Sequence, residues 1–292
     1  MEPETEALLA RLKALADPLR LRLVALCVRG ECSVSELTDV LSQSQPRISQ
    51  HLKVLCDAAL LQRFRDGHYV YYRAPVRGRP AATLRRLLAL FPEDEPDFRR
   101  DLERLRALRG GAPAQETPEG DRSLHRALVE LTVSTPLGDL IDIGCGQGRI
   151  LKLLASRAQR AVGVDIDADA RRFARAEVLL AGLPNCTLRK GDMYDLPFAD
   201  REFDTVVLDD VLNDAEKPLA AIAEAQRLLK SGGRLLFLSS VSADGVDAGR
   251  ARFVAHARAA GLRLSAPKAL PAVEPRWLLA VATHAGESSA AA

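Results

Sequence analysis

Three glycines at alternating positions follow an apolar stretch in the second half of the chain, and acidic residues flank them. The stretch runs from Leu140 to Gly148 and reads LIDIGCGQG. Glycine permits tight turns and lets a ligand approach the main chain. Asp165 ends the next apolar stretch, 23 residues after Asp142, where a carboxylate can accept hydrogen bonds from both hydroxyls of a ribose. The pattern therefore predicts a nucleoside-binding loop.

A third acidic residue and a regular alternation of segments extend this pattern. Asp192 lies in the stretch KGDMYDLPF, and short apolar runs alternate with helical periodicity on both sides of it. Such alternation predicts an α/β domain with a doubly wound, Rossmann-like parallel sheet. Glycine-rich turns and acids at strand ends occur in any such sheet. Several motifs in this order, however, favour a nucleoside site over a purely structural arrangement.

Residues 121–285 as a whole resemble the class I S-adenosylmethionine-dependent methyltransferases. The resemblance is carried by LIDIGCGQG, VGVDID, GDMYDLPFADREFDTVVLDDVL and RLLKSGGRLLFL. It implies S-adenosylmethionine or S-adenosylhomocysteine as the ligand, without a metal. It also implies individual roles: Gly144 and Gly146 face the amino-acid part of the ligand, Asp165 holds the ribose, Ile166 and Met193 enclose the adenine, Asp192 accepts a hydrogen bond from its amine, and Asp209 lies near the sulfur. Asp142 and Gly148 complete the predicted binding set.

The first third of the chain has a local excess of positive charge that the net charge of +2 conceals. Between Leu41 and Arg79 there are seven basic residues and two acidic ones, which gives this stretch a charge of +5. A local excess of this kind suits a polyanionic partner.

The elements predicted for this region are four short helices followed by a hairpin. Ser33 and Glu36 form a capping-box pattern ahead of the third helix, and a fourth helix is expected from about Gln45 to Ala59. Asp66-Gly67 separates two alternating runs, which is a strong hairpin signal. This order predicts an α+β winged helix-turn-helix whose fourth helix enters the major groove of DNA. The predicted DNA-binding residues are Ser44, Gln45, Arg47, Ser49, Gln50, His51 and Lys53 on that helix, and Arg63, Arg65 and His68 along the wing.

Residues 5–90 resemble the ArsR-type family of bacterial repressors. The resemblance is densest in the fourth helix and in the wing sequence DGHYVYYR. It implies a homodimer on a palindromic operator, paired through the segments Leu8–Leu15 and Leu84–Phe91. Metal-sensing members carry a cysteine pair in the third helix, whereas Ser33 and Ser35 stand at the matching positions here. Metal sensing through this helix is therefore not expected.

The length of 292 residues suggests two domains. We expect a DNA-binding and dimerisation domain over 1–92, a helical linker over 93–120, a nucleoside-binding domain over 121–285 and a disordered tail over 286–292. The five cysteines form no CxxC pair, and neither a membrane span nor a secretory signal is apparent. The expected location is the cytoplasm. The charged segment Pro96–Arg109 is either a mechanical link between the domains or a plain spacer.

Catalysis and ligand sensing remain alternative uses of such a nucleoside site. Methyl transfer needs a pocket that aligns the acceptor, the methyl group and the sulfur. After Asp209 the chain carries Asp210, Asn213 and Asp214, where family enzymes often place aromatic or histidine residues, so we assign no catalytic residue. The fusion resembles proteobacterial repressors that sense S-adenosylhomocysteine and control methionine-cycle genes. The alternatives are a working small-molecule methyltransferase with its own DNA-binding regulator and a dimerisation module that binds no ligand.

Overall fold

The computed structural model describes residues 3–66, 69–75, 78–90, 95–109, 119–241 and 244–284. The chain divides into two compact units, the first comprising residues 1–113 and 175–187 and the second comprising residues 114–174 and 188–292. The predicted domain boundaries at 92/93 and 120/121 stay predictions, and the predicted tail over 286–292 lies outside the described residues.

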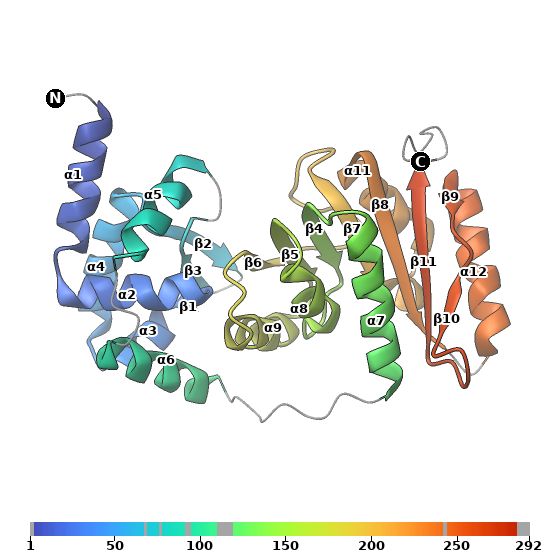
Figure 1. The fold of residues 1–292 in the computed structure, drawn as a ribbon, viewed down its shortest axis with the longest axis horizontal. Helices are drawn as coiled ribbons and strands as arrows, with labels where there is room; N and C mark the ends of the chain where they lie inside the picture. Colours follow the sequence, from blue (N-terminus) through green and yellow to red (C-terminus); the bar gives the residue numbers. More distant parts are fainter. Residues whose placement is uncertain are drawn as a thin grey trace. The chain divides into compact units, whose positions relative to one another are not determined.

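The first unit contains short helices and a small sheet. In chain order its main elements are α1 (Pro3–Leu15), α2 (Pro18–Arg29), β1 (Cys32–Ser33), α3 (Val34–Leu41), α4 (Gln45–Asp57), β2 (Gln62–Asp66), β3 (Tyr69–Arg73), α5 (Gly78–Leu88) and α6 (Pro96–Leu108) (Figure 1). The three strands form one sheet in the order β1-β3-β2. Asp66 pairs with Tyr69 in the antiparallel β2–β3 ladder, which confirms the predicted hairpin, although Gly67 and His68 lie outside the described residues.

Local capping explains where the helices begin. The Asp17 carboxylate accepts a hydrogen bond of 2.9 Å from the Arg20 amide at the start of α2. At the start of α3, Ser33 and Glu36 form the reciprocal pair of hydrogen bonds that the sequence predicts. Ile48, Leu52 and Leu55 of α4 are buried, as expected. Burial of this stripe leaves the opposite side of α4 in contact with solvent.

The helix α6, predicted as part of a linker, packs against α2 and α3 within the first unit. Its Asp101 is buried and accepts two hydrogen bonds of 2.6 Å from the Arg22 guanidinium of α2. Leu105 is also buried, whereas Leu108 is 49% exposed. The helix is thus anchored by an ion pair as well as by apolar contacts.

A buried ion network lies in the first unit and joins residues that are far apart in the sequence. The Arg175 guanidinium donates a hydrogen bond of 3.1 Å to Glu31, donates another to Asp66, and stacks on the Tyr71 ring. All three charged side chains are at least 96% buried. Burial of charges is tolerated only when they are paired, so these residues depend on one another.

The second unit is built around an eight-stranded sheet. Its main elements are α7 (Glu119–Ser134), β4 (Asp139–Ile143), α8 (Arg149–Ala155), β5 (Arg160–Asp165), α9 (Ala168–Leu180), β6 (Cys186–Lys190), β7 (Phe203–Asp209), α10 (Val211–Asp214), α11 (Pro218–Leu228), β8 (Leu229–Ser240), α12 (Gly245–Ala259), β9 (Leu262–Leu264), β10 (Lys268–Leu270) and β11 (Trp277–His284). The C-terminal part of α9 and the start of β6 belong to the first unit. The strand order is β10-β11-β8-β7-β4-β5-β6, with β9 beside β11.

The sheet is mixed, which corrects the expectation of a parallel sheet. The pairs β4–β5, β4–β7 and β7–β8 are parallel, whereas β11 pairs antiparallel with β8, and β9 and β10 pair antiparallel with β11. The predicted doubly wound, Rossmann-like α/β fold is confirmed. Only the expectation that all strands are parallel was wrong, because the alternation of strands and helices stops after α12 and the last strands return without a crossover helix between them.

The two faces of the sheet are covered by different helices. Side chains of α11 and α12 share one core with Ile141, Ile143, Leu208 and Leu278 of the strands. Helix α8 contacts β4 and β5, and it also contacts α7. Successive side chains of a strand point to opposite faces. Asp142, Asp209 and Trp277 therefore point away from the α11 and α12 core.

Candidate functional sites

The glycine-rich loop between β4 and α8 adopts a backbone that glycine favours. Gly144, Gly146 and Gly148 have φ angles of +69°, +50° and +80°, in the left-handed region. A side chain at Gly144 would collide with Val211, whereas a Cβ atom at Gly146 would meet nothing within 4 Å. The loop therefore leaves open space beside its own backbone at Gly146, as a ligand-binding loop requires.

Asp165 at the end of β5 lies directly against this loop. Its carboxylate accepts hydrogen bonds from the Gly146 amide at 2.7 Å and from the Asp167 amide at 2.8 Å. Each carboxylate oxygen has a further lone pair. The residue that the sequence predicts to hold a ribose is thus fixed beside the loop and retains acceptor capacity.

A cavity of about 570 Å³ adjoins this loop. Its lining residues are Ile143, Gly144, Asp165, Ile166, Gly191, Asp192, Met193, Tyr194, Val211, Asp214 and Glu216. Five predicted residues are thus brought together, namely Gly144, Asp165, Ile166, Asp192 and Met193. Ile166 is 66% exposed, so its side chain can contact an apolar ring in the cavity.

Four predicted residues lie outside the lining of this cavity: Asp142, Gly146, Gly148 and Asp209. Asp142 is buried beneath the loop, and its Oδ1 atom has no hydrogen-bond partner among the described residues. Burial, reinforced by the negative charge of Asp209, raises the pKa of Asp142 well above its usual range. Asp142 is therefore a buried acid within β4 that does not line the cavity.

Asp209 is ion-paired with a residue that the sequence analysis did not select. Arg149, the first residue of α8, donates hydrogen bonds of 3.1 Å and 3.3 Å to the two Asp209 oxygens. Its guanidinium also lies 4.1 Å from the centre of the Trp277 ring. Arg149 directly follows Gly148, which was a usable signal, but Trp277 lies 128 residues further along the chain and gave none.

The polar side chains after β7 and β8 hydrogen-bond to one another. Asp210 accepts hydrogen bonds from the Ser240 amide at 2.6 Å, from the Ser240 hydroxyl at 2.9 Å and from Asn213 at 3.1 Å. Asn213 also donates to the Ser239 hydroxyl at 2.9 Å. These groups tie the ends of the two strands together.

The predicted DNA-binding residues of α4 lie mostly on its exposed side. Ser44, Gln45, Arg47, Gln50 and Lys53 are exposed, and Ser49 is half-buried. Arg47 donates a hydrogen bond of 2.8 Å to Gln43. His51 is half-buried and lies 3.7 Å from Asp17, so it is the least available member of the set.

The wing adds two exposed cations. Arg63 and Arg65 of β2 are exposed, and the predicted wing residue His68 lies outside the described residues. Arg73 of β3 is partly buried: it lies 3.6 Å from Glu31 and stacks on Phe64. Its role within the first unit is therefore structural.

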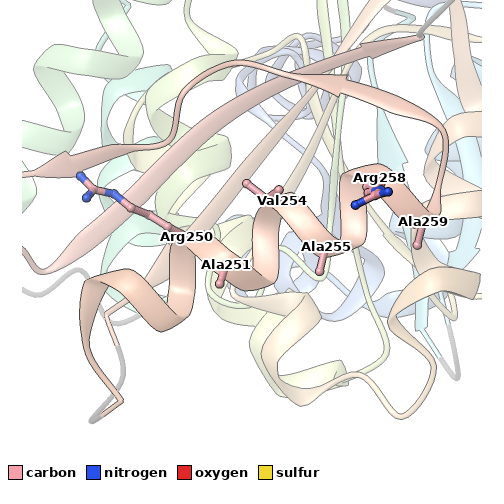
Figure 2. A pocket seen from close by; sticks show the side chains of 6 residues that line it. All are labelled: Arg250, Ala251, Val254, Ala255, Arg258 and Ala259. Carbon is pink, nitrogen blue, oxygen red and sulfur yellow. The ribbon is translucent and has the colours of Figure 1, made fainter.

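A second hollow lies on the outer side of α12 (Figure 2). It is lined by Arg250, Ala251, Val254, Ala255, Arg258 and Ala259, all from this one helix. Within the described part of the chain, no cluster of three or more His, Cys, Asp or Glu side chains is placed to hold a metal ion. None of the described helices is long and apolar enough to cross a membrane.

Comparison with known proteins matches two separate segments of the chain to two family models. Residues 17–63 match the model described as "Bacterial regulatory protein, arsR family", and residues 141–237 match the model described as "Methyltransferase domain". The arsenic resistance transcriptional regulator ArsR1 of Pseudomonas putida is 50% identical over 62 residues, which cover 21% of this chain and 48% of that protein. The demethylmenaquinone methyltransferase of Symbiobacterium thermophilum is 30% identical over 120 residues, which cover 40% of this chain and 48% of that protein.

These relatives are matched only in part, since the chain spans about half of the length of each. Among solved structures, a methyltransferase from Aquifex aeolicus matches 57% of this chain and 93% of its own, with 17% identity and a TM-score of 0.49. The family models thus place an ArsR-family helix-turn-helix domain in the first part of the chain and a methyltransferase domain in the second.

Proposed function

We propose that this fusion of an ArsR-family domain with a methyltransferase domain is a transcriptional repressor that senses S-adenosylhomocysteine or S-adenosylmethionine. In this proposal a cytoplasmic homodimer binds a palindromic operator, and nucleoside binding changes its affinity for that operator. The controlled genes belong to the methionine cycle, where both nucleosides are metabolites. Ligand binding, sensing, dimerisation and coupling each have separate support.

Support for ligand binding comes from the fit between the cavity and an adenosine conjugate. The cavity combines an apolar side chain at each of Ile166 and Met193 with carboxylates at Asp165 and Asp192. The open space at Gly146 can admit an amino-acid tail, since nothing lies within 4 Å of a Cβ atom built there. The lining carries no Arg or Lys, and it has two further acids, Asp214 and Glu216, which disfavours phosphorylated nucleotides.

The observation that favours ligand sensing over catalysis is the set of hydrogen bonds made by Asp210. An acceptor pocket needs free volume and an oriented nucleophile beside the methyl group. Here Asp210, Asn213 and Ser240 satisfy one another at distances of 2.6–3.1 Å. In the alternative, a working small-molecule methyltransferase, these hydrogen bonds would have to break to make room for the acceptor.

Support for a homodimer comes from apolar side chains on the first unit. Leu8, Leu9 and Leu12 of α1 are 37–43% exposed, and Leu90, just after α5, is 79% exposed. A hollow between α1 and α5 includes Leu8 and Leu87. Exposed apolar clusters of this kind mark protein–protein interfaces. Pairing through these two helices is the arrangement expected from the resemblance, although Phe91 lies outside the described residues.

Helix α9 provides a covalent route for coupling. It begins three residues after Asp165, and its last residues belong to the first unit, where Arg175 binds Glu31 and Asp66. The helix α6 is anchored in the same unit through Arg22 and Asp101. Coupling through either helix can be only as large as the difference in ligand affinity between the DNA-bound and free states.

The test is a gel-shift titration with an operator that the protein itself selects. A duplex is enriched from a random pool on the purified full-length protein, and the complex is then titrated with each nucleoside and with adenosine. We expect one of the two nucleosides to release the duplex, whereas adenosine alone leaves it bound. A complex that is unaffected by either nucleoside contradicts the sensor proposal. Transfer of a radiolabelled methyl group to any small acceptor would favour the enzyme instead.

A further inference from the structure

Two buried arginines lie one turn apart on α9. Arg171 is 3% exposed and Arg175 is 4% exposed, although arginine is ordinarily a surface residue. Side chains four residues apart in a helix are neighbours, so both guanidinium groups lie on one side of α9. Arg171 belongs to the second unit and Arg175 to the first. Each has a hydrogen-bond acceptor within its own unit.

Arg171 ties the start of α9 to Asp165. Its guanidinium donates a hydrogen bond of 3.0 Å to the Asp165 carbonyl oxygen. The carboxylate of Asp165 accepts hydrogen bonds from the Gly146 amide and from the amide of Asp167, the residue before α9. A nucleoside that binds this carboxylate therefore acts on the residue to which the start of α9 is bound.

Arg175 ties the same helix to the hairpin of β2 and β3, the predicted wing. Its guanidinium donates a hydrogen bond to Asp66, the last residue of β2, and lies 4.1 Å from the centre of the Tyr71 ring of β3. It also donates a hydrogen bond of 3.1 Å to Glu31. Because these charges are buried, separating the guanidinium from the two acids is costly. The hairpin therefore follows Arg175 when α9 shifts.

The exposed cations of the wing lie on the opposite face of β2. Successive side chains of a strand point to opposite faces, so Arg63 and Arg65 point away from the face on which Asp66 lies. Both arginines are exposed, whereas Asp66 is buried. Contacts between such cations and phosphates position a protein on DNA. A shift of Asp66 and Tyr71 therefore changes how far these two cations reach.

We infer that Arg175 is a positioning residue that sets the wing, and that the nucleoside response reaches DNA through the wing rather than through α4. This requires a nucleoside to bind at Asp165 and to change the affinity for DNA, so the inference rests on the proposed function. In this arrangement α4 supplies the same affinity for DNA with and without the nucleoside, and only the contacts of the wing differ between the two states.

The test measures the dissociation constant of the full-length protein for the selected duplex by fluorescence anisotropy, with and without each nucleoside at saturation. For the wild type we expect the two constants to differ by about fivefold or more for one nucleoside, the lower end of ordinary allosteric coupling. Arg63→Gln combined with Arg65→Gln should bring this ratio close to one, because the contacts that the nucleoside alters are already lost. Arg47→Gln on α4 should weaken duplex binding by the same factor in both states and so keep the wild-type ratio.

A second set of variants tests α9 itself. Arg171→Gln removes the hydrogen bond to the Asp165 carbonyl and should bring the ratio close to one, while duplex binding without the nucleoside stays at the wild-type value. The control is Arg172→Gln at the adjacent exposed position, which should keep the wild-type ratio. Arg175→Lys keeps the buried positive charge but cannot bind both acids and stack on Tyr71 as the guanidinium does, so the ratio should fall. An unchanged ratio in a less stable Arg175→Lys protein would make Arg175 merely structural.

The ratios separate the inference from the proposed function. A wild-type ratio of one for both nucleosides overturns the proposed function. A wild-type ratio that differs from one but survives in the double wing variant or in Arg171→Gln overturns the inference alone, as does a ratio that is lost in Arg47→Gln. Calorimetric titration of each variant establishes that the nucleoside is at saturation, and fluorescence of the single tryptophan, Trp277, checks that the second unit is folded. The wing substitutions are at exposed positions, so they decide the inference even where Arg171→Gln does not fold.

Discussion

The buried network around Arg175 allows a quantitative prediction about stability. Arg175→Met removes a guanidinium that is 96% buried, hydrogen-bonds Glu31 and Asp66, and stacks on Tyr71. Glu31 and Asp66 are 97% and 98% buried, so water cannot readily replace the lost partner. Removing one partner of a buried ion pair typically costs about 3–5 kcal/mol. We expect a loss of this size in the free energy of unfolding of the first unit.

The assay can separate the two units because their chromophores differ. Three of the four tyrosines, Tyr69, Tyr71 and Tyr72, lie in the first unit, whereas the single tryptophan lies in the second. Urea unfolding followed by tyrosine fluorescence and by operator binding reports the first unit, and Trp277 fluorescence reports the second. We expect the midpoint of the first-unit transition to fall well below that of the wild type.

The matched control is Arg172→Met in the same helix. Arg172 is 73% exposed and pairs with the exposed Asp169, so its loss should change stability by about 0.5 kcal/mol or less. A first-unit destabilisation below about 1 kcal/mol in Arg175→Met, or one no larger than that of the control, would refute the reasoning that this network stabilises the unit.

Three further predictions concern DNA binding, pH dependence and assembly. Arg47→Ala should weaken binding to the selected operator by about 1–3 kcal/mol in a fluorescence anisotropy titration, and an unchanged footprint would rule it out as a base-reading residue. Because the pKa of Asp142 is raised in the folded protein, the free energy of unfolding should fall as the pH rises above about 3.9, the pKa of an aspartate in the unfolded chain. Asp142→Asn should remove this pH dependence, which is measured by urea unfolding at pH 5 and pH 8 with Trp277 fluorescence as the signal. Leu12→Glu, at an exposed position of α1, should convert a dimer to a monomer in sedimentation velocity, and an unchanged mass would exclude α1 from the interface.

Much of the fold could be predicted from local signals. The capping box at Ser33 and the hairpin of β2 and β3 each have a local signal in the sequence, so these elements lie near where they were expected. The alternation of strands and helices indicated the sheet up to β8. The antiparallel return of β11 gave no comparable signal, because a buried strand of this kind pairs through contacts distant in sequence.

In the candidate site, too, some features could be predicted from the sequence, whereas contacts between residues far apart in the chain could not. Asp165, Ile166, Asp192 and Met193 follow consecutive strands of the sheet, so their convergence at one cavity could be predicted from strand order. The contact of Arg149 with Trp277 joins residues from α8 and β11 and could not be predicted from spacing. The burial of Arg175 was equally hidden, since a helical arginine is ordinarily exposed.

Linkage between the two ligands is the most direct test of the central claim. The affinity for the selected duplex is measured by fluorescence anisotropy with and without saturating S-adenosylhomocysteine, and the affinity for the nucleoside is measured with and without saturating duplex. The two ratios must agree, because coupling between two binding equilibria is reciprocal. We predict equal ratios that differ clearly from one, and we predict that Asp165→Ala abolishes the nucleoside effect while preserving duplex binding. A nucleoside that binds the wild type while both ratios stay at one would contradict the account.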